Sequence, residues 1–175
     1  FNKYVPVVNY EEFFPEIQKT LKGERNNICP GSIKWFAKSS GTTNDKSKFI
    51  PVSDISLRDN HFKAGKDLLC SYLNNKKSSK LFDGRSLALG GSKQITPFDD
   101  NQMIFTGDIS AILLKNLPMW ASVSRTPPLK VALMPEWEEK LKLMAKITSK
   151  QNITSLSGVP TWTIVLIKEV LKYTG

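Results

Sequence analysis

Apolar residues recur along this chain of 175 residues with two different periods, and the change of period divides it into helices and strands. Helical spacing, together with capping residues, predicts helices over residues 10–22, 53–74, 108–117, 135–150 and 161–173. Alternating or short continuous apolar runs between turn residues predict strands over residues 33–38, 48–52, 85–91, 130–133 and 152–160. Pro15 is expected in the first turn of its helix or at a break in that helix.

The predicted helices and strands alternate, and this order favours an α/β fold with a mixed or largely parallel sheet flanked by helices. The length favours one domain or most of one. In sheets of this kind, ligands gather at the carboxyl ends of the strands. The polar segment that follows the strand over residues 33–38 stands at such an end, so it is the first place to look for a binding site.

Composition narrows the class of protein. Hydrophobic residues make up 40% of the chain and charged residues 23%, which is typical of a folded globular protein. The formal charge of +9 favours an anionic partner such as a nucleotide, a nucleic acid or a membrane surface. The basic residues are scattered, and no apolar run approaches the ~18 residues of a membrane span. We therefore expect neither a membrane nor a nucleic acid as partner, while a non-catalytic basic module that binds nucleic acid stays an alternative.

Cysteine and histidine give no sign of a metal site. The chain has two cysteines, Cys29 and Cys70, and one histidine, His61, with no metal-ligand spacing among them. Free thiols in a reducing cytoplasm are favoured over a disulfide. His61 is interpreted as a surface or packing residue rather than a general base. The chain starts at Phe1 without the layout of a signal peptide, and we expect further residues upstream.

The segment "KSSGTTNDKSK" (residues 38–48) carries the strongest candidate chemistry. One glycine, Gly41, is surrounded by four residues with hydroxyl side chains: Ser39, Ser40, Thr42 and Thr43. Such a loop can turn its backbone N–H groups and hydroxyls toward one anion, and Lys46 and Lys48 add positive charge. A polar turn without a ligand is the alternative. The Walker pattern and the dinucleotide fingerprint are both missing, so composition alone leaves the two interpretations open.

The longer stretch "SSGTTNDKSKFIPVS" resembles the phosphate-binding loop of adenylate-forming enzymes. More narrowly, it is similar to the loop of the auxin-responsive promoter (Gretchen Hagen) family of acyl-acid amido synthetases. The matching positions are Ser39, Ser40, Gly41, Thr42, Thr43, Lys48, Phe49, Ile50 and Pro51. Residues 5–24 and "SLSGVPTW" (155–162) also resemble the family, so the likeness spans nearly the whole chain. Asp45 stands where the family usually has a glycine, and we expect this carboxylate to face solvent.

The resemblance implies a function. It implies ATP-dependent adenylation of a carboxylic acid, followed by transfer of the acyl group to an amine such as an amino acid. The cofactors implied are ATP and Mg²⁺, with the phosphates held by Ser39, Ser40, Gly41, Thr42, Thr43 and Lys48. No protein metal ligand and no catalytic residue is assigned. An acyl–coenzyme A ligase, which shares the loop, is the alternative enzyme.

The resemblance also implies an architecture. Residues 1–175 are expected to form an incomplete N-terminal adenylation-type α/β domain, without the C-terminal lid and inactive alone. Trp120 and Trp162 are candidates for an acyl pocket, because such pockets are mostly apolar, with core packing as the alternative. "FTGD" (105–108) mimics part of a ribose-binding motif but comes too early in the chain, so Asp108 is predicted to cap a helix instead.

Overall fold

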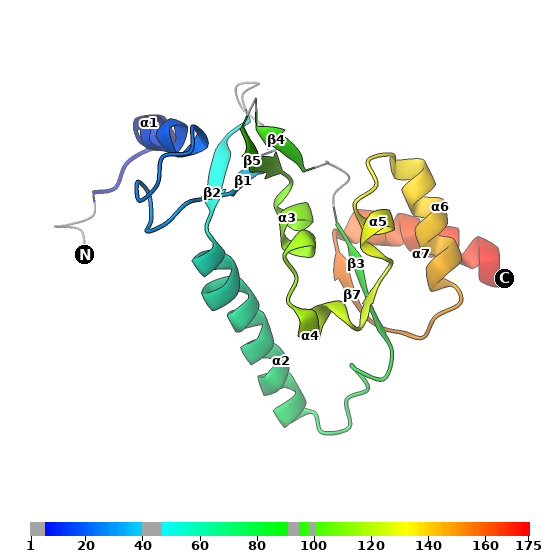
Figure 1. The fold of residues 1–175 in the computed structure, drawn as a ribbon. Coiled ribbons are helices and arrows are strands. Elements are labelled where there is room, and N and C mark those ends of the chain that lie inside the picture. The colour runs from blue at the N-terminus through cyan, green and yellow to red at the C-terminus, as the bar shows by residue number, and fades with distance from the viewer. Residues whose placement is uncertain (1–5, 40–46, 91–94, 99–100) are drawn as a thin grey trace. The chain divides into compact units, whose positions relative to one another are not determined.

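The computed structural model describes residues 6–39, 47–90, 95–98 and 101–175, without the side chains of residues 101 and 102 (Figure 1). The chain forms two compact units. The first contains Phe1–Asp54 and Ile95–Gly107, and the second contains Ile55–Gln94 and Asp108–Gly175. Neither unit is continuous in sequence, because the segment 95–107 returns to the first unit after the second has begun.

The first unit is a four-stranded mixed sheet with one helix. Its strands, in sheet order, are β2 (Phe49–Val52), β1 (Trp35–Lys38), β5 (Asn101–Gly107) and β4 (Thr96–Phe98). β1 pairs with β5 in parallel, whereas the β1–β2 and β4–β5 pairs are antiparallel. The parallel pair and the two hairpins together make the sheet mixed, as the alternation of elements predicts.

Helix α1 (Tyr10–Leu21) supplies much of the core of the first unit. It begins with a capping box, in which Glu12 N donates to Asn9 Oδ1 at 2.9 Å and Asn9 N donates to Glu12 Oε2 at 3.0 Å. The buried core cluster is formed by Ile17, Leu21, Ile33, Phe36 and Ile104. Pro15 lies inside an unbroken helix, so the prediction of a first-turn or break position is wrong. The packing of Ile17 and Leu21 beyond it outweighs the one hydrogen bond that proline removes.

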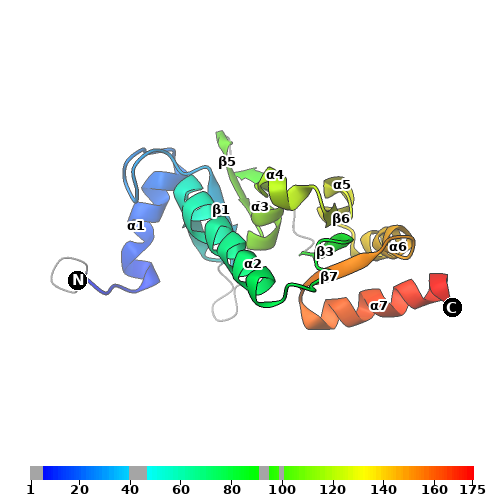
Figure 2. The same ribbon diagram turned by 90° about the horizontal axis from the view of Figure 1, so that it is seen from below.

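The second unit is built on a parallel three-stranded sheet. Its strands, in sheet order, are β6 (Arg125–Thr126), β3 (Arg85–Leu89) and β7 (Ile153–Gly158). Its helices are η1 (Ser56–Phe62), α2 (Lys63–Asn75), α3 (Ile109–Lys115), α4 (Met119–Ser122), α5 (Leu129–Ala132), α6 (Trp137–Thr148) and α7 (Pro160–Thr174). Helices α6 and α7 lie side by side, as Figures 1 and 2 show.

The core of the second unit lies between its sheet and these two helices. Leu87 and Leu89 from β3 pack with Met144 and Ala145 of α6 and Leu166 of α7. All five side chains are nearly or fully buried. Burial on this scale is the main favourable contribution to folding of the unit, because each fully buried leucine or methionine side chain stabilises it by about 1.5–3 kcal/mol.

Several features of the fold differ from the sequence-based expectation. Residues 130–133 were expected as a strand, but Leu129–Ala132 form the helical turn α5, with Pro128 at its N-cap. The strands β4 and β5 lie in a stretch for which no element was predicted. The helix predicted from residue 53 begins with a π-helical segment, η1, before it continues as α2. Cys29 and Cys70 are free thiols, as predicted.

Candidate functional site

Two of the residues assigned to phosphate, Ser39 and Lys48, are described, and they join the ends of β1 and β2. Ser39 N donates to Lys48 O at 2.9 Å, and Lys48 N donates to Ser39 Oγ at 2.9 Å. The loop therefore leaves the sheet at the carboxyl end of β1, where the sequence places it. The other residues assigned to phosphate lie outside the described residues, and these are Ser40, Gly41, Thr42 and Thr43. The charged neighbours Asp45 and Lys46 also lie outside them.

The first turn of α1 holds the second end of this loop. The Tyr10 hydroxyl accepts a hydrogen bond from Phe49 N at 2.8 Å and donates to Phe49 O at 3.4 Å. Lys48 Nζ lies 4.8 Å from the centre of the Tyr10 ring and 3.4 Å from Glu11 Oε1. The Lys48–Glu11 pair is exposed to solvent, and such pairs contribute about 0–1 kcal/mol. A bound phosphate could therefore replace Glu11 as the partner of Lys48 at little cost.

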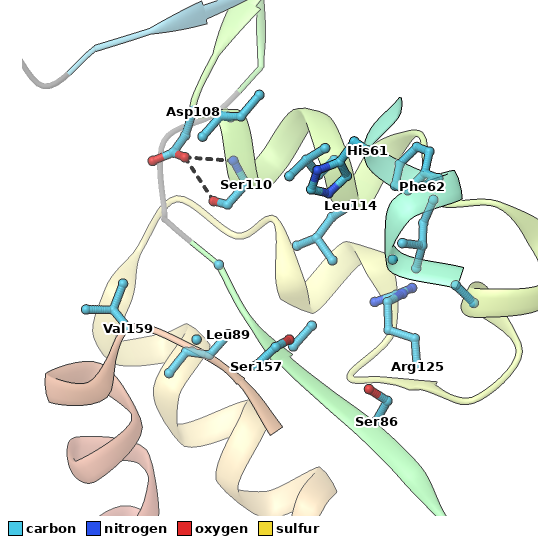
Figure 3. Close-up of a pocket in the computed structure, with 18 of the residues that line it drawn as sticks. His61, Phe62, Ser86, Leu89, Asp108, Ser110, Leu114, Arg125, Ser157 and Val159 are labelled. Carbon is cyan, nitrogen blue, oxygen red and sulfur yellow. Dashed lines mark hydrogen bonds between the residues drawn. The ribbon is translucent and has the colours of Figure 1, made fainter. Parts of the chain in front are cut away.

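The second unit contains a cavity of about 730 Å³ (Figure 3). This volume is within the range of small-molecule sites. Helical segments η1, α2, α3 and α4 form one wall, and β3, β7 and the start of α7 form another. The lining is mostly apolar, and it includes both Trp120 and Trp162. The two tryptophans that sequence reasoning offered for an acyl pocket thus meet in one pocket, although they are far apart in sequence.

The hollow results from the alternation of small and large side chains along the strands. Successive residues of a strand point to opposite faces of the sheet. Ser86 and Ala88 of β3, with Ser157 of β7 beside Ala88, line the pocket. Leu87 belongs to the core shared with α6 and α7. Serine and alanine leave space where larger residues would fill it, so the alternation in "RSLAL" was a signal for the pocket that sequence reasoning missed.

Asp108 lies at the edge of this pocket as a helix cap. Its Oδ1 accepts hydrogen bonds from Ser110 N and from Ser110 Oγ, both at 2.9 Å (Figure 3). The predicted role of Asp108 as the N-cap of the helix after it is confirmed. The cap fixes the first turn of α3, whose residues form part of the pocket wall.

A lysine is fully buried next to the same wall. Lys140 of α6 has no solvent-exposed surface, and its Nζ donates to Gly90 O at 3.0 Å, just beyond the carboxyl end of β3. Burial lowers the pKa of Lys140, while the negative charge of Asp108 opposes this shift. Sequence reasoning missed Lys140, although its spacing from Trp137 and Met144 places it on the apolar face of α6.

Stability is expected to depend on the protonation of Lys140. Because the pKa is lowered in the folded state, the unfolded chain binds this proton more tightly, and the free energy of unfolding rises with pH through the interval between the lowered pKa and the ordinary value of 10.5. Below that interval the cost of burying the charge is fully present. Urea unfolding measured from neutral pH to about 10.5 should show a smaller rise for Lys140→Met than for the unsubstituted protein.

The control for this experiment is Lys146→Met, on the exposed side of the same helix. It should keep the rise in stability, because it removes an exposed charge and leaves the buried Lys140 in place. If Lys140→Met and the unsubstituted protein gave parallel pH curves, burial of the Lys140 charge would not contribute to stability.

Two further polar side chains reach the pocket. His61, at the end of η1, is exposed and lies edge-on to Phe62, with 5.3 Å between the ring centres. Arg125 of β6 is partly buried, donates to the carbonyl of Pro127, and has a pKa lowered by burial. Sequence reasoning took His61 as a surface or packing residue and did not single out Arg125. The position of Arg125 depends on a short strand that the sequence pattern did not reveal.

Two further kinds of feature concern the described ranges, residues 6–39, 47–90, 95–98 and 101–175. No group of three or more His, Cys, Asp or Glu side chains in these ranges is placed to hold a metal ion. Across the described helices, none has the length and apolar character required to cross a bilayer.

Comparison with known proteins decides the family. Residues 1–174 match the GH3 family N-terminal domain. The chain belongs to the GH3 family. The match confirms the resemblance carried by the loop motif, and it covers both units, so the loop and the pocket belong to one family domain.

Curated GH3 proteins of plants are similar to this chain. Jasmonoyl–L-amino acid synthetase JAR6 of Nicotiana attenuata is 30% identical over 96 residues, which are 54% of this chain and 14% of that protein. The 4-substituted benzoates–glutamate ligase GH3.12 of Arabidopsis thaliana is 26% identical over 178 residues, covering 98% of this chain. This chain therefore spans only 30% of the length of GH3.12.

Solved GH3 structures share the fold. The GH3.15 acyl acid amido synthetase matches with a TM-score of 0.71 at 21% identity, covering 99% of this chain and 30% of that chain. The AtGH3.15 structure in complex with 2,4-DB matches with a TM-score of 0.73. The predicted α/β architecture, with a mixed sheet like that in the N-terminal part of these synthetases, is therefore confirmed.

Proposed function

We propose that the complete protein activates a carboxylic acid with ATP and transfers the acyl group to an amine, and that this chain supplies the phosphate loop and the acyl pocket. The observation that carries the proposal is the family match over residues 1–174, which includes the S-S-G-T-T loop. The apolar cavity that holds Trp120 and Trp162 supports an acid substrate with a hydrophobic body. The curated relatives are named for joining acids to amino acids, which supports an amino acid as the amine.

The reaction has two balanced steps. An oxygen of the carboxylate attacks the α-phosphorus of ATP and pyrophosphate leaves, and then the amine nitrogen attacks the acyl carbon, with loss of a proton and release of AMP. The chain's own contribution to the first step is to hold the leaving pyrophosphate. Donors placed in advance around the β- and γ-phosphates stabilise the charge that grows there.

The assigned donors are the backbone and side chains of the loop. Ser39, Ser40, Gly41, Thr42 and Thr43 are proposed to donate hydrogen bonds to phosphate oxygens, and Lys48 to add positive charge. Ser39 Oγ accepts from Lys48 N, so its own proton is directed elsewhere and is available to a phosphate. Mg²⁺ is proposed to enter with ATP, held by phosphate oxygens and water rather than by protein side chains. The proposed location is the cytoplasm, because free thiols are kept reduced there.

The experiment that tests this function is ATP–pyrophosphate exchange by the complete protein with a panel of carboxylic acids. We expect exchange that requires both an acid and Mg²⁺, and release of AMP only when an amino acid is added. Assays without acid give the background. Consumption of coenzyme A in place of the amine would assign the protein to the acyl–coenzyme A ligases. A folded protein that supports no exchange with any acid would contradict the proposal.

A further inference from the structure

The charges around the pocket are unevenly balanced. Asp108 lies close enough to Lys140 for the two charges to interact, so the carboxylate at one end of the pocket has a cationic partner in the protein. Arg125 lines the same pocket, and the structure shows no carboxylate within ion-pair distance of it among the described residues. A partly desolvated guanidinium in an apolar pocket favours an anionic partner, because burial of an unpaired charge is costly.

The guanidinium keeps hydrogen-bond donors available to a ligand. One N–H group, on Nη1, donates to the carbonyl of Pro127. The other guanidinium nitrogens of Arg125 make no hydrogen bond to the described residues. Because no buried side-chain nitrogen or oxygen in these residues lacks a hydrogen-bond partner, those nitrogens are not buried and remain accessible. The planar guanidinium presents its N–H groups in pairs, and such a pair matches the two oxygens of a carboxylate.

Arg125 enters the pocket far from the carboxyl ends of the strands. The register of the sheet places Arg125 beside Ser86, which is four residues before Gly90. At the rise of an extended strand, this separation corresponds to roughly 13 Å along β3. Figure 3 shows the Arg125 side chain rising from the level of Ser86 into the pocket, below Phe62 and on the opposite side of the view from Asp108.

This position separates Arg125 from the expected site of reaction. In open α/β sheets the chemistry takes place at the carboxyl ends of the strands, here near Gly90 and Gly158. The reacting carboxylate must also leave an oxygen free to attack phosphorus, whereas a carboxylate held by a guanidinium fork has both oxygens engaged. The group that meets Arg125 is therefore a second acidic group on the same ligand, at the other end of its apolar body.

We propose that Arg125 recognises a second carboxylate on the acyl acid, so that the pocket takes dicarboxylic acids whose acidic groups are separated by an apolar body. The proposal deepens the proposed function and rests on it for the identity of the reacting group. It makes Arg125 a specificity-determining residue. The apolar walls and the tryptophans contact the body of the ligand, while the two ends are held by different parts of the protein.

The test is isothermal titration calorimetry of the complete protein, without ATP. The probes are straight-chain α,ω-dicarboxylic acids of increasing length and their monomethyl esters, which have nearly the same size but one carboxylate fewer. We expect one range of lengths in which the diacid binds about 10-fold more tightly than its ester. In Arg125→Met the diacid should bind no more tightly than the ester, and Arg125→Lys should keep part of the preference, because it keeps the charge but loses the fork.

The matched control is Arg85→Met. Arg85 also donates from Nη1 to a backbone carbonyl, that of Val123 at 2.8 Å, but it does not line the pocket, so the preference for the diacid should remain. The proposal is overturned if the unsubstituted protein binds diacid and ester equally or binds neither, or if Arg125→Met keeps the preference. The length series needs no substitution, so it decides the question even if a variant fails to fold.

Two further outcomes separate this inference from the proposed function. Acid-dependent exchange confined to monocarboxylic acids would retain the proposed function and overturn the role of Arg125. Tight diacid binding that depends on Arg125, without pyrophosphate exchange, would retain the recognition and overturn the proposed function. Glutamate forms a separate arm of the titration, since it also carries two carboxylates. Its binding in place of the diacids would assign Arg125 to the amine substrate and overturn the proposal.

Discussion

Replacing Thr42 with alanine is expected to lower acid-dependent ATP–pyrophosphate exchange by the complete protein about 100-fold. Thr42 lies outside the described residues, and the expectation rests on its place in the S-G-T-T motif and on the family match. A hydroxyl placed in advance beside the leaving pyrophosphate acts mainly in the transition state. Its removal should therefore lower kcat more than it raises KM for ATP.

Lys48→Ala is expected to lower the same exchange by a smaller factor. The Lys48 side chain is about half exposed and its ammonium group also pairs with Glu11, so water and salt screen its effect on a phosphate. Thr174→Ala, near the C-terminal end of α7, removes a hydroxyl outside the loop and should leave the exchange unchanged. Unchanged exchange in both Thr42→Ala and Lys48→Ala would contradict the assignment of the loop to phosphate.

Gly158→Ala is expected to lower the free energy of unfolding by about 1–3 kcal/mol. Gly158 is the last residue of β7, and a Cβ atom there would lie 2.8 Å from Leu89 Cβ and 3.1 Å from Leu89 O. Both contacts involve atoms fixed by the backbone of β3, so neither can move away without shifting the strand. Urea unfolding followed by circular dichroism measures the change, which should appear as a lower midpoint with an unchanged slope.

Gly65→Ala provides a control of opposite sign. Gly65 also lines the pocket, but it lies in α2, where an added Cβ would have no neighbour within 4 Å. Alanine restricts the unfolded chain and favours a helix, so this variant should be more stable by about 0.5–1 kcal/mol. If both substitutions destabilised the protein equally, the close approach of β7 to β3 would not be the cause of the Gly158 effect.

Sequence patterns predicted the long helices and the strands β1, β2, β3 and β7, and they missed several of the other short elements. The helices α1 and α6 have amphipathic periods, and α7 is largely apolar. All three have clear ends, and they were predicted to within about two residues. Residues 130–133 are too few for their period to distinguish a helical turn from a strand. In β4, Pro97 and the acidic residues after it indicate a loop, and only pairing with β5 makes this segment a strand.

The candidate site could be predicted where its chemistry is local in sequence. The proposed phosphate loop is one continuous motif, so the sequence contains it entirely. The pocket is assembled from distant segments, and only its tryptophans were identified as candidates in advance. Lysine is a residue type usually found at the surface, and only the spacing of Lys140 from the apolar residues of α6 places it on the buried face. Arg125 could not be predicted, because its place in the pocket depends on the pairing of β6 with β3.

The grouping of tryptophans around the pocket has a practical consequence. Trp120 and Trp162 line the cavity, and the Trp162 indole lies 5.4 Å from that of Trp137, between ring centres. The fourth tryptophan, Trp35, packs against Phe105 in the other compact unit. A molecule that enters the cavity and displaces water from these indoles will change their fluorescence. The protein thus carries intrinsic fluorophores with which occupancy of the site can be followed without an added label.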